Sequence, residues 1–130
     1  MITLRFESED LKMHDLLDDL QQTPLPDGVS ASITPMVIAK EGDRPISVDV
    51  LEILARIDVT EEAIKWVINL ALTYAFVKIN RIAFAEPHIL LRFENGAKRK
   101  ILYDKGDSDI VEELLSFVMK GDVKSIVFKT

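Results

Sequence analysis

The chain contains no cysteine, and this absence excludes disulfides, thiolate nucleophiles and cysteine-based zinc sites together. Its five glycines are dispersed along the sequence, so there is no glycine-rich loop of the kind that cradles a phosphate after a strand. The G-x-S-x-G, H-E-x-x-H and EF-hand patterns are missing as well. Nothing near the two histidines indicates a paired nucleophile. The sequence therefore predicts no cofactor and leans away from an enzyme.

Positive charge and long hydrophobic runs are also scarce. The net charge of −6 argues against nucleic-acid binding, which requires a basic face. The first residues, Met1–Glu7, do not have the basic segment and apolar core of a secretory signal, so we expect a cytoplasmic protein. The uncharged run Trp66–Val77 would extend about 18 Å as a helix, against a hydrocarbon core of about 30 Å. We therefore expect no membrane span.

What is present is material for one hydrophobic core. The chain has 130 residues, of which 48% are hydrophobic and 29% are charged, and both values are ordinary for a globular domain. No repeat, low-complexity tract or linker interrupts it. The sequence therefore predicts a single domain over residues 1–130.

The segment 58–80 predicts a long helix around which the rest of the chain is arranged. It begins with a capping-box-like pair, Asp58 and Glu61. On a helical wheel its polar positions form one narrow stripe, made up of Lys65, Asn69 and Thr73. Phe76 and Lys78 interrupt this pattern. About two-thirds of the circumference is apolar, whereas a surface helix normally carries an apolar stripe of about 100°.

An apolar arc of this width predicts that the helix is covered from at least two directions. The cover is either internal, from a sheet and a neighbouring helix, or a partner chain, most simply a second copy of the protein. Ala71 and Ala75 form a groove of small residues that suits an internal contact as well as a dimer seam. The candidate interface residues are Trp66, Leu70, Ala71, Tyr74, Ala75 and Val77.

Hydrophobic periodicity places the other elements. Strands are expected at 2–7, 30–40, 81–94, 98–104 and 125–128, and helices at 9–22 and between Ser108 and Gly121. Pro35 cannot donate a ladder hydrogen bond, so the second strand is expected at a sheet edge or with a bulge. We expect Ser8 to cap the first helix.

The segment 46–57 fits two structures. Its apolar residues from Val50 to Ile57 fall at helical spacing, whereas Ile46, Val48 and Val50 alternate as in a strand. We predict a helix here. The resulting order is β-α-β-α-α-β-β-α-β, an α+β domain with one mixed or antiparallel sheet of about five strands and helices mainly on one face.

Asn95-Gly96 predicts a hairpin turn. A two-residue turn would pair Leu91 with Lys100, whereas a loop that includes Ala97 would pair Leu91 with Ile101. Both registers set like charges opposite each other. We expect the second register, or a bulge, because it collects the apolar side chains on one face. These side chains are Ile89, Leu91, Ile101 and Tyr103.

Two polar groups are candidate sites. Basic residues near the hairpin can contact an anion or an acidic partner surface, although an exposed hairpin balanced by carboxylates is the simpler explanation. They are Arg92, Lys98, Arg99 and Lys100. Asp10, His14 and Asp18 lie four residues apart on one predicted helix face. Three exposed ligands without supporting hydrogen bonds make a poor metal site, so we predict no metal.

We therefore predict a small, non-catalytic interaction module that self-associates through the 58–80 helix, most simply as a homodimer. One alternative is a small-molecule-binding or enzymatic domain with a pocket between this helix and the sheet, where Asn69, Thr73 or His88 would converge. The other alternative is an acidic regulator or inhibitor of a basic partner.

Overall fold

Six strands and three helices follow one another along the chain in a computed structural model. It describes residues 1–9, 11–22, 24–38, 46–56, 58–59, 61–78, 88–103 and 109–129, with the side chains at 37, 38, 46, 77 and 78 excepted. The elements are β1 (Ile2–Glu7), α1 (Met13–Gln21), β2 (Val29–Ile38), β3 (Ile46–Ala55), α2 (Glu61–Thr73), η1 (Tyr74–Lys78), β4 (His88–Phe93), β5 (Lys98–Leu102), α3 (Asp109–Met119) and β6 (Val123–Lys129).

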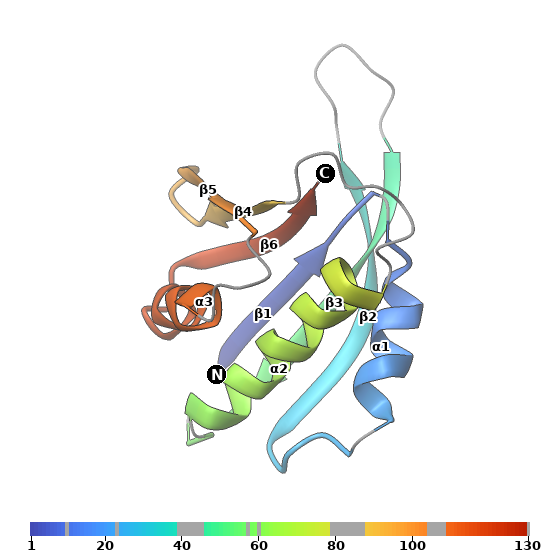
Figure 1. Cartoon of the computed structure of the whole chain (residues 1–130), viewed down its shortest axis with the longest axis vertical. Helices are drawn as coiled ribbons and strands as arrows, with labels where there is room; N and C mark the ends of the chain where they lie inside the picture. Colours follow the sequence, from blue (N-terminus) through green and yellow to red (C-terminus); the bar gives the residue numbers. More distant parts are fainter. Residues whose placement is uncertain are drawn as a thin grey trace.

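The strands form one mixed sheet in the order β2-β3-β1-β6-β4-β5 (Figure 1). β1 is parallel to β6, and the other neighbouring strands are antiparallel. The three helices pack on the same face, where their buried side chains form one core with the sheet. The predicted α+β class, with helices on one face of a mixed sheet, is confirmed. The sheet has six strands because one predicted helix is a strand.

That strand is β3, so the helix predicted at 46–57 is wrong. β3 lies between β2 and β1, and side chains on both of its faces are buried, as shown by Val50 at 1% and Leu51 at 0% exposure. A strand buried on both faces reads as a continuous apolar run, which also satisfies helical spacing. The alternation of β-branched residues was the correct signal.

The long helix is present as α2 and its π-helical continuation η1. Thr60 and residues 79–80 lie outside the described residues, and Asp58 pairs with Arg56 at 3.4 Å. Phe76, which interrupted the α-helical wheel, is 2% exposed. A π turn takes more residues than an α turn, and this rotates Phe76 towards the sheet. Its ring centroid lies 4.4 Å from that of Tyr103 and 5.6 Å from that of Phe128.

The two shorter helices differ from the prediction mainly at their starts. The N-cap of α1 is Lys12, which makes no side-chain cap, and Ser8 is buried instead. The predicted apolar stripe of α1 is otherwise present, with Met13, Leu16 and Leu20 buried. Gly121 follows α3 with a φ of +81°, the left-handed conformation expected after a helix. Ser108 lies outside the described residues.

The β4–β5 hairpin has neither expected register. Its loop has three residues, 94–96, closed by a hydrogen bond from the Phe93 amide to the Ala97 carbonyl at 2.9 Å. Gly96 has a φ of +87°, as in three-residue loops with a bulge. Leu91 pairs with Arg99, two residues from the expected partner. A shift by two keeps every side chain on its face, so the predicted apolar face is retained.

Candidate functional site

The apolar arc of α2 is covered by the chain itself. Ala71 and Ala75 are 0% exposed and Tyr74 is 5% exposed, all within the core. Trp66 and Leu70 are half-buried and pack against the same core. The side chain of Val77 lies outside the described residues. The internal cover accounts for most of the arc, and Trp66 and Leu70 are the described candidates that keep an exposed side.

Contacts on both flanks hold α2 in place. On one flank the Tyr74 hydroxyl donates to the Lys12 carbonyl oxygen at 3.1 Å. Burial, helped by the carboxylates of Asp15 and Asp19 on α1, raises the pKa of Tyr74 to about 12. On the other flank Lys65 forms an ion pair with Glu112 of α3. The helix is therefore clamped between α1 and α3.

The side chains expected to converge in a pocket between the helix and the sheet do not meet. The Thr73 hydroxyl donates to the Asn69 carbonyl oxygen at 2.9 Å on the outer side of α2. His88 pairs with Leu102 and Lys129 in the sheet. It shares its strand face with Leu90 and Arg92, opposite the buried Ile89 and Leu91. We refer to this face, which carries none of the described helices, as the open face; on its β6 strand Ser125 and Val127 are nevertheless buried, at 2% and 6% exposure.

Strand alternation divides the candidate basic residues between the two faces. Arg99 lies on the helix side, where its Nη2 atom is 2.9 Å from Glu113 Oε1 and its guanidinium is 5.1 Å from the centroid of the Phe117 ring. Lys98 and Lys100 are exposed on the open face, because successive side chains of a strand point to opposite sides. Arg92 is on the open face too, but its guanidinium forms an ion pair with Glu7.

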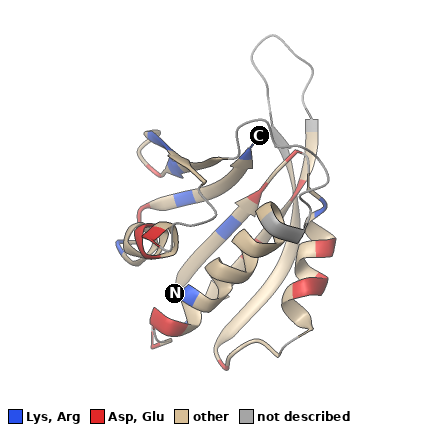
Figure 2. Cartoon of the chain, viewed as in Figure 1, with Lys and Arg blue, Asp and Glu red and all other residues tan. Residues whose placement is uncertain are grey.

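Three strands arrange nine open-face side chains in cross-strand rows. The rows are Ser125–Arg92–Lys98, Val127–Leu90–Lys100 and Lys129–His88–Leu102. Four of the nine side chains are Lys or Arg and none is acidic. We call the nine side chains together the basic sheet face. In Figure 2, Lys and Arg colour parts of the β4–β5 hairpin and of β6, and acidic residues colour parts of α1, α3 and the start of α2. Leu102 is 59% exposed.

A buried ion pair borders the basic sheet face. Arg92 Nη1 lies 3.1 Å from Glu7 Oε1 on β1, and the Glu7 side chain is 3% exposed. Because β6 separates β4 from β1, the arginine side chain must cross β6 to make this contact. Among the described residues, Glu7 Oε2 and Ser125 Oγ are buried without a hydrogen-bond partner. The Arg92 charge is therefore neutralised within the fold.

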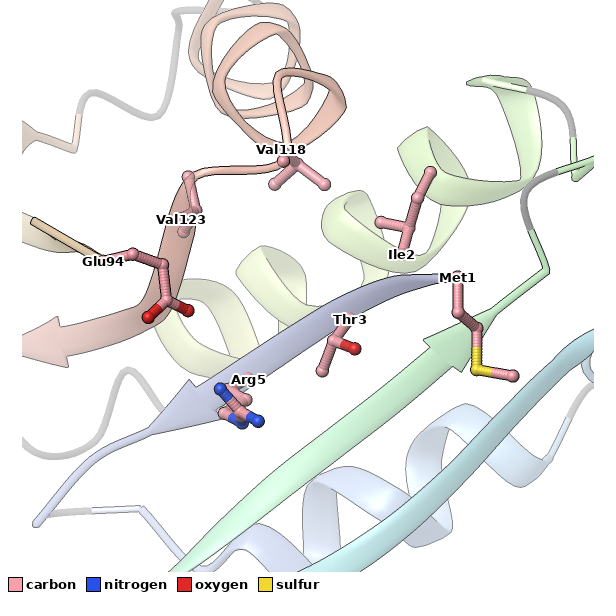
Figure 3. Close-up of a pocket in the computed structure, with 8 residues that line it drawn as sticks. Met1, Ile2, Thr3, Arg5, Glu94, Val118 and Val123 are labelled. Atoms are coloured by element: carbon pink, nitrogen blue, oxygen red, sulfur yellow. The ribbon is translucent and has the colours of Figure 1, made fainter.

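A cavity of about 210 Å³ opens where β1 and β6 diverge (Figure 3). β1 and β6 are paired at Phe6 and Glu7, whereas the ladder of β1 with β3 begins at Ile2. Arg5 and Glu94 line the cavity, and Arg5 is also bonded to Glu52 at 3.3 Å. The volume is below the range of about 300–1,000 Å³ that is typical of small-molecule sites.

The three side chains considered as metal ligands are described only in part. His14 Nε2 lies 3.3 Å from Asp49 Oδ2, and Asp10 lies outside the described residues. Within the described ranges, no group of three or more His, Asp or Glu side chains is placed to hold a metal ion. No helix in those ranges is long and apolar enough to cross a membrane.

Comparisons with protein-family models, curated proteins and solved structures find no match to this chain. The candidate site is therefore defined by geometry. Sequence reasoning identified Lys98 and Lys100 but missed Lys129, Leu90 and Leu102, which join them through the β4–β5 and β4–β6 pairings. The alternation within 88–93 was a usable signal for Leu90. No local pattern pairs β6 with β4.

Proposed function

We propose that this chain is a small, non-catalytic protein-interaction module that binds an acidic partner through the basic sheet face. The observation that supports this proposal is the concentration of Lys98, Lys100 and Lys129 around Leu90 and Leu102 on a chain whose net charge is −6. Complementary charge steers a partner to such a face and fixes its orientation. Leu102, which is 59% exposed, supplies an apolar contact that charge alone does not.

The proposal moves the predicted interface from α2 to the sheet. The cover of α2 comes largely from its own subunit, so the reason for expecting a second copy there is weaker. The basic sheet face also suits a different chain better than a copy. In a twofold dimer the same patch meets itself, which would set Lys98, Lys100 and Lys129 against like charges.

A head-to-tail contact between copies is the remaining form of self-association. The exposed carboxylates of α1, including Asp15 and Asp18, would then lie against the basic sheet face of the next copy. Heterologous contacts of this kind form rings or open filaments. The size of the protein in solution distinguishes this arrangement from a heterologous partner.

A photo-crosslinking amino acid placed at Leu102 in the full chain, in cells that produce it, tests the proposal. The matched control carries the same probe at Asn69, which is exposed on α2. We expect a crosslinked protein at Leu102, none at Asn69, and loss of the crosslink when Lys98→Glu is added. Crosslinks confined to Asn69, or crosslinks at Leu102 that are insensitive to Lys98→Glu, would overturn the proposed function.

A further inference from the structure

We infer that the partner of the basic sheet face supplies an extended acidic segment that pairs with the outer edge of β5, an inference that rests on the proposed function. β5 stands at one end of the sheet order and is paired with β4 along Lys98–Leu102. No strand among the described residues pairs with its other edge, which therefore presents backbone donors and acceptors that an incoming strand can use. Proteins commonly bind extended peptides by adding them as a strand to such an edge.

The side chains of β5 define the chemistry of the segment. Neighbouring strands place their side chains opposite each other on each face. On the open face an added strand would meet Lys98, Lys100 and Leu102, all exposed. A carboxylate opposite each lysine and an apolar side chain opposite Leu102 would match these exposed side chains. The matching segment therefore carries, at every second position, two acidic residues with an apolar residue next to them.

The same charges exclude a second copy of β5 from this edge. Two antiparallel β5 strands would bring the run Lys98-Arg99-Lys100 of one chain against that of the other, and like charges opposite each other destabilise a sheet. Lysines on an edge strand generally prevent such edge-to-edge pairing. They also select among partners, because a repulsion against one strand is part of specificity for another.

A single-stranded nucleic acid is the other extended polyanion, and the face is poorly built for it. Such ligands are held by aromatic side chains on which the bases stack. Of the nine open-face positions of β4, β5 and β6, His88 alone holds a ring, and Leu90, Leu102 and Val127 stand where further aromatic rings would be needed. Phe93 contacts Phe117 of α3, on the helix side. The observations therefore favour a polypeptide.

A labelled synthetic peptide whose alternate positions are glutamate, glutamate and leucine, separated by threonine, tests the inference with the full-length chain. By fluorescence anisotropy at low salt we expect saturable binding that weakens steeply as salt is added. Lys98→Glu should weaken the affinity about tenfold. The same charge reversal at the exposed Lys12, before α1, should leave it unchanged. The inference would be contradicted if a peptide with lysine in place of glutamate bound equally well. It would also be contradicted if the charge reversals at Lys98 and Lys12 weakened the affinity equally.

Amide hydrogen exchange separates strand addition from contact with side chains alone. We expect the peptide to slow exchange at β5 amides that point away from β4. Binding without this protection overturns strand addition but supports the proposed function. No peptide binding while the Leu102 crosslink persists also overturns the inference alone. If the otherwise unchanged chain gives no crosslink at Leu102, both proposals are wrong. Preferential binding of oligodeoxythymidine also overturns both, because it would identify a nucleic-acid site.

Discussion

Arg92 and Glu7 form an ion pair that spans three strands, with 3.1 Å between Nη1 and Oε1. Arg92 lies opposite Lys98 in the β4–β5 ladder, where two cations would repel each other. By crossing β6 to reach Glu7, the arginine relieves this repulsion and neutralises a buried carboxylate at the same time. The contact also lies where the ladder between β1 and β6 is limited to Phe6 and Glu7.

Arg92→Met is expected to lower the free energy of unfolding by about 2–4 kcal/mol, because it leaves the Glu7 carboxylate buried without its cation. We place the loss below that of a fully buried pair, since Arg92 is 32% exposed. Glu7→Gln should restore part of the stability in the double variant. Urea unfolding measures all of these values. Lys98→Met is the control, and an equal effect there would remove the special role of the ion pair.

Phe76→Ala should destabilise the fold by about 3–5 kcal/mol, because the ring is buried between Tyr103 and Phe128. A straight α-helix would instead place this side chain beside the polar stripe and make the change nearly neutral. Asn69→Ala, on that stripe, should stay within about 0.5 kcal/mol of the parent. Urea unfolding of the two variants therefore tests the π turn, and similar values would contradict it.

Tyr74 is expected to make stability depend on alkaline pH. Its pKa rises from 10.0 to about 12 on folding, so its contribution is complete below the unfolded pKa and is lost as the pH rises through the folded one. The loss should reach about 1.4 kcal/mol near pH 11. Tyr74→Phe should begin about 1 kcal/mol less stable, through the missing hydrogen bond, and this deficit should vanish towards pH 11. Parallel pH profiles would contradict the assignment.

Leu70→Glu distinguishes internal cover of α2 from a shared interface. Leu70 packs against its own core, so the variant should lose about 1–3 kcal/mol of stability while its mass by light scattering matches that of the parent. Trp66→Glu should behave alike, and Asn69→Glu should change neither property. A parent dimer that becomes a folded monomer on either change would return the interface to α2.

The long helix, the apolar stripes and the hairpin position follow from periods that the sequence displays locally. The 46–57 segment was ambiguous: Ile46, Val48 and Val50 alternate as in a strand, but burial on both faces of β3 leaves an apolar run after Val50 that also fits helical spacing. The hairpin register depended on whether Gly96 adopts the left-handed conformation within a three-residue loop, which the dipeptide Asn95-Gly96 alone does not determine.

The candidate site was predictable only in part. Lys98 and Lys100 stand out in an acidic chain, but the sequence grouped Arg92 and Arg99 with them. The carboxylates that pair with Arg92 and Arg99 belong to Glu7 and Glu113, which are 85 and 14 residues away in the chain. Contacts at such separations depend on strand order, which no local pattern encodes.

The position of β6 has a consequence for how the molecule is made. In the sheet order it joins β2-β3-β1 to β4-β5, although it is the last strand along the chain. During synthesis both halves are complete before the strand that unites them leaves the ribosome. Until then β1 has an unprotected edge, and closure must wait for a contact between distant parts of the chain, which slows folding. Truncation before Val123 should therefore yield two unjoined half-sheets that are prone to aggregate.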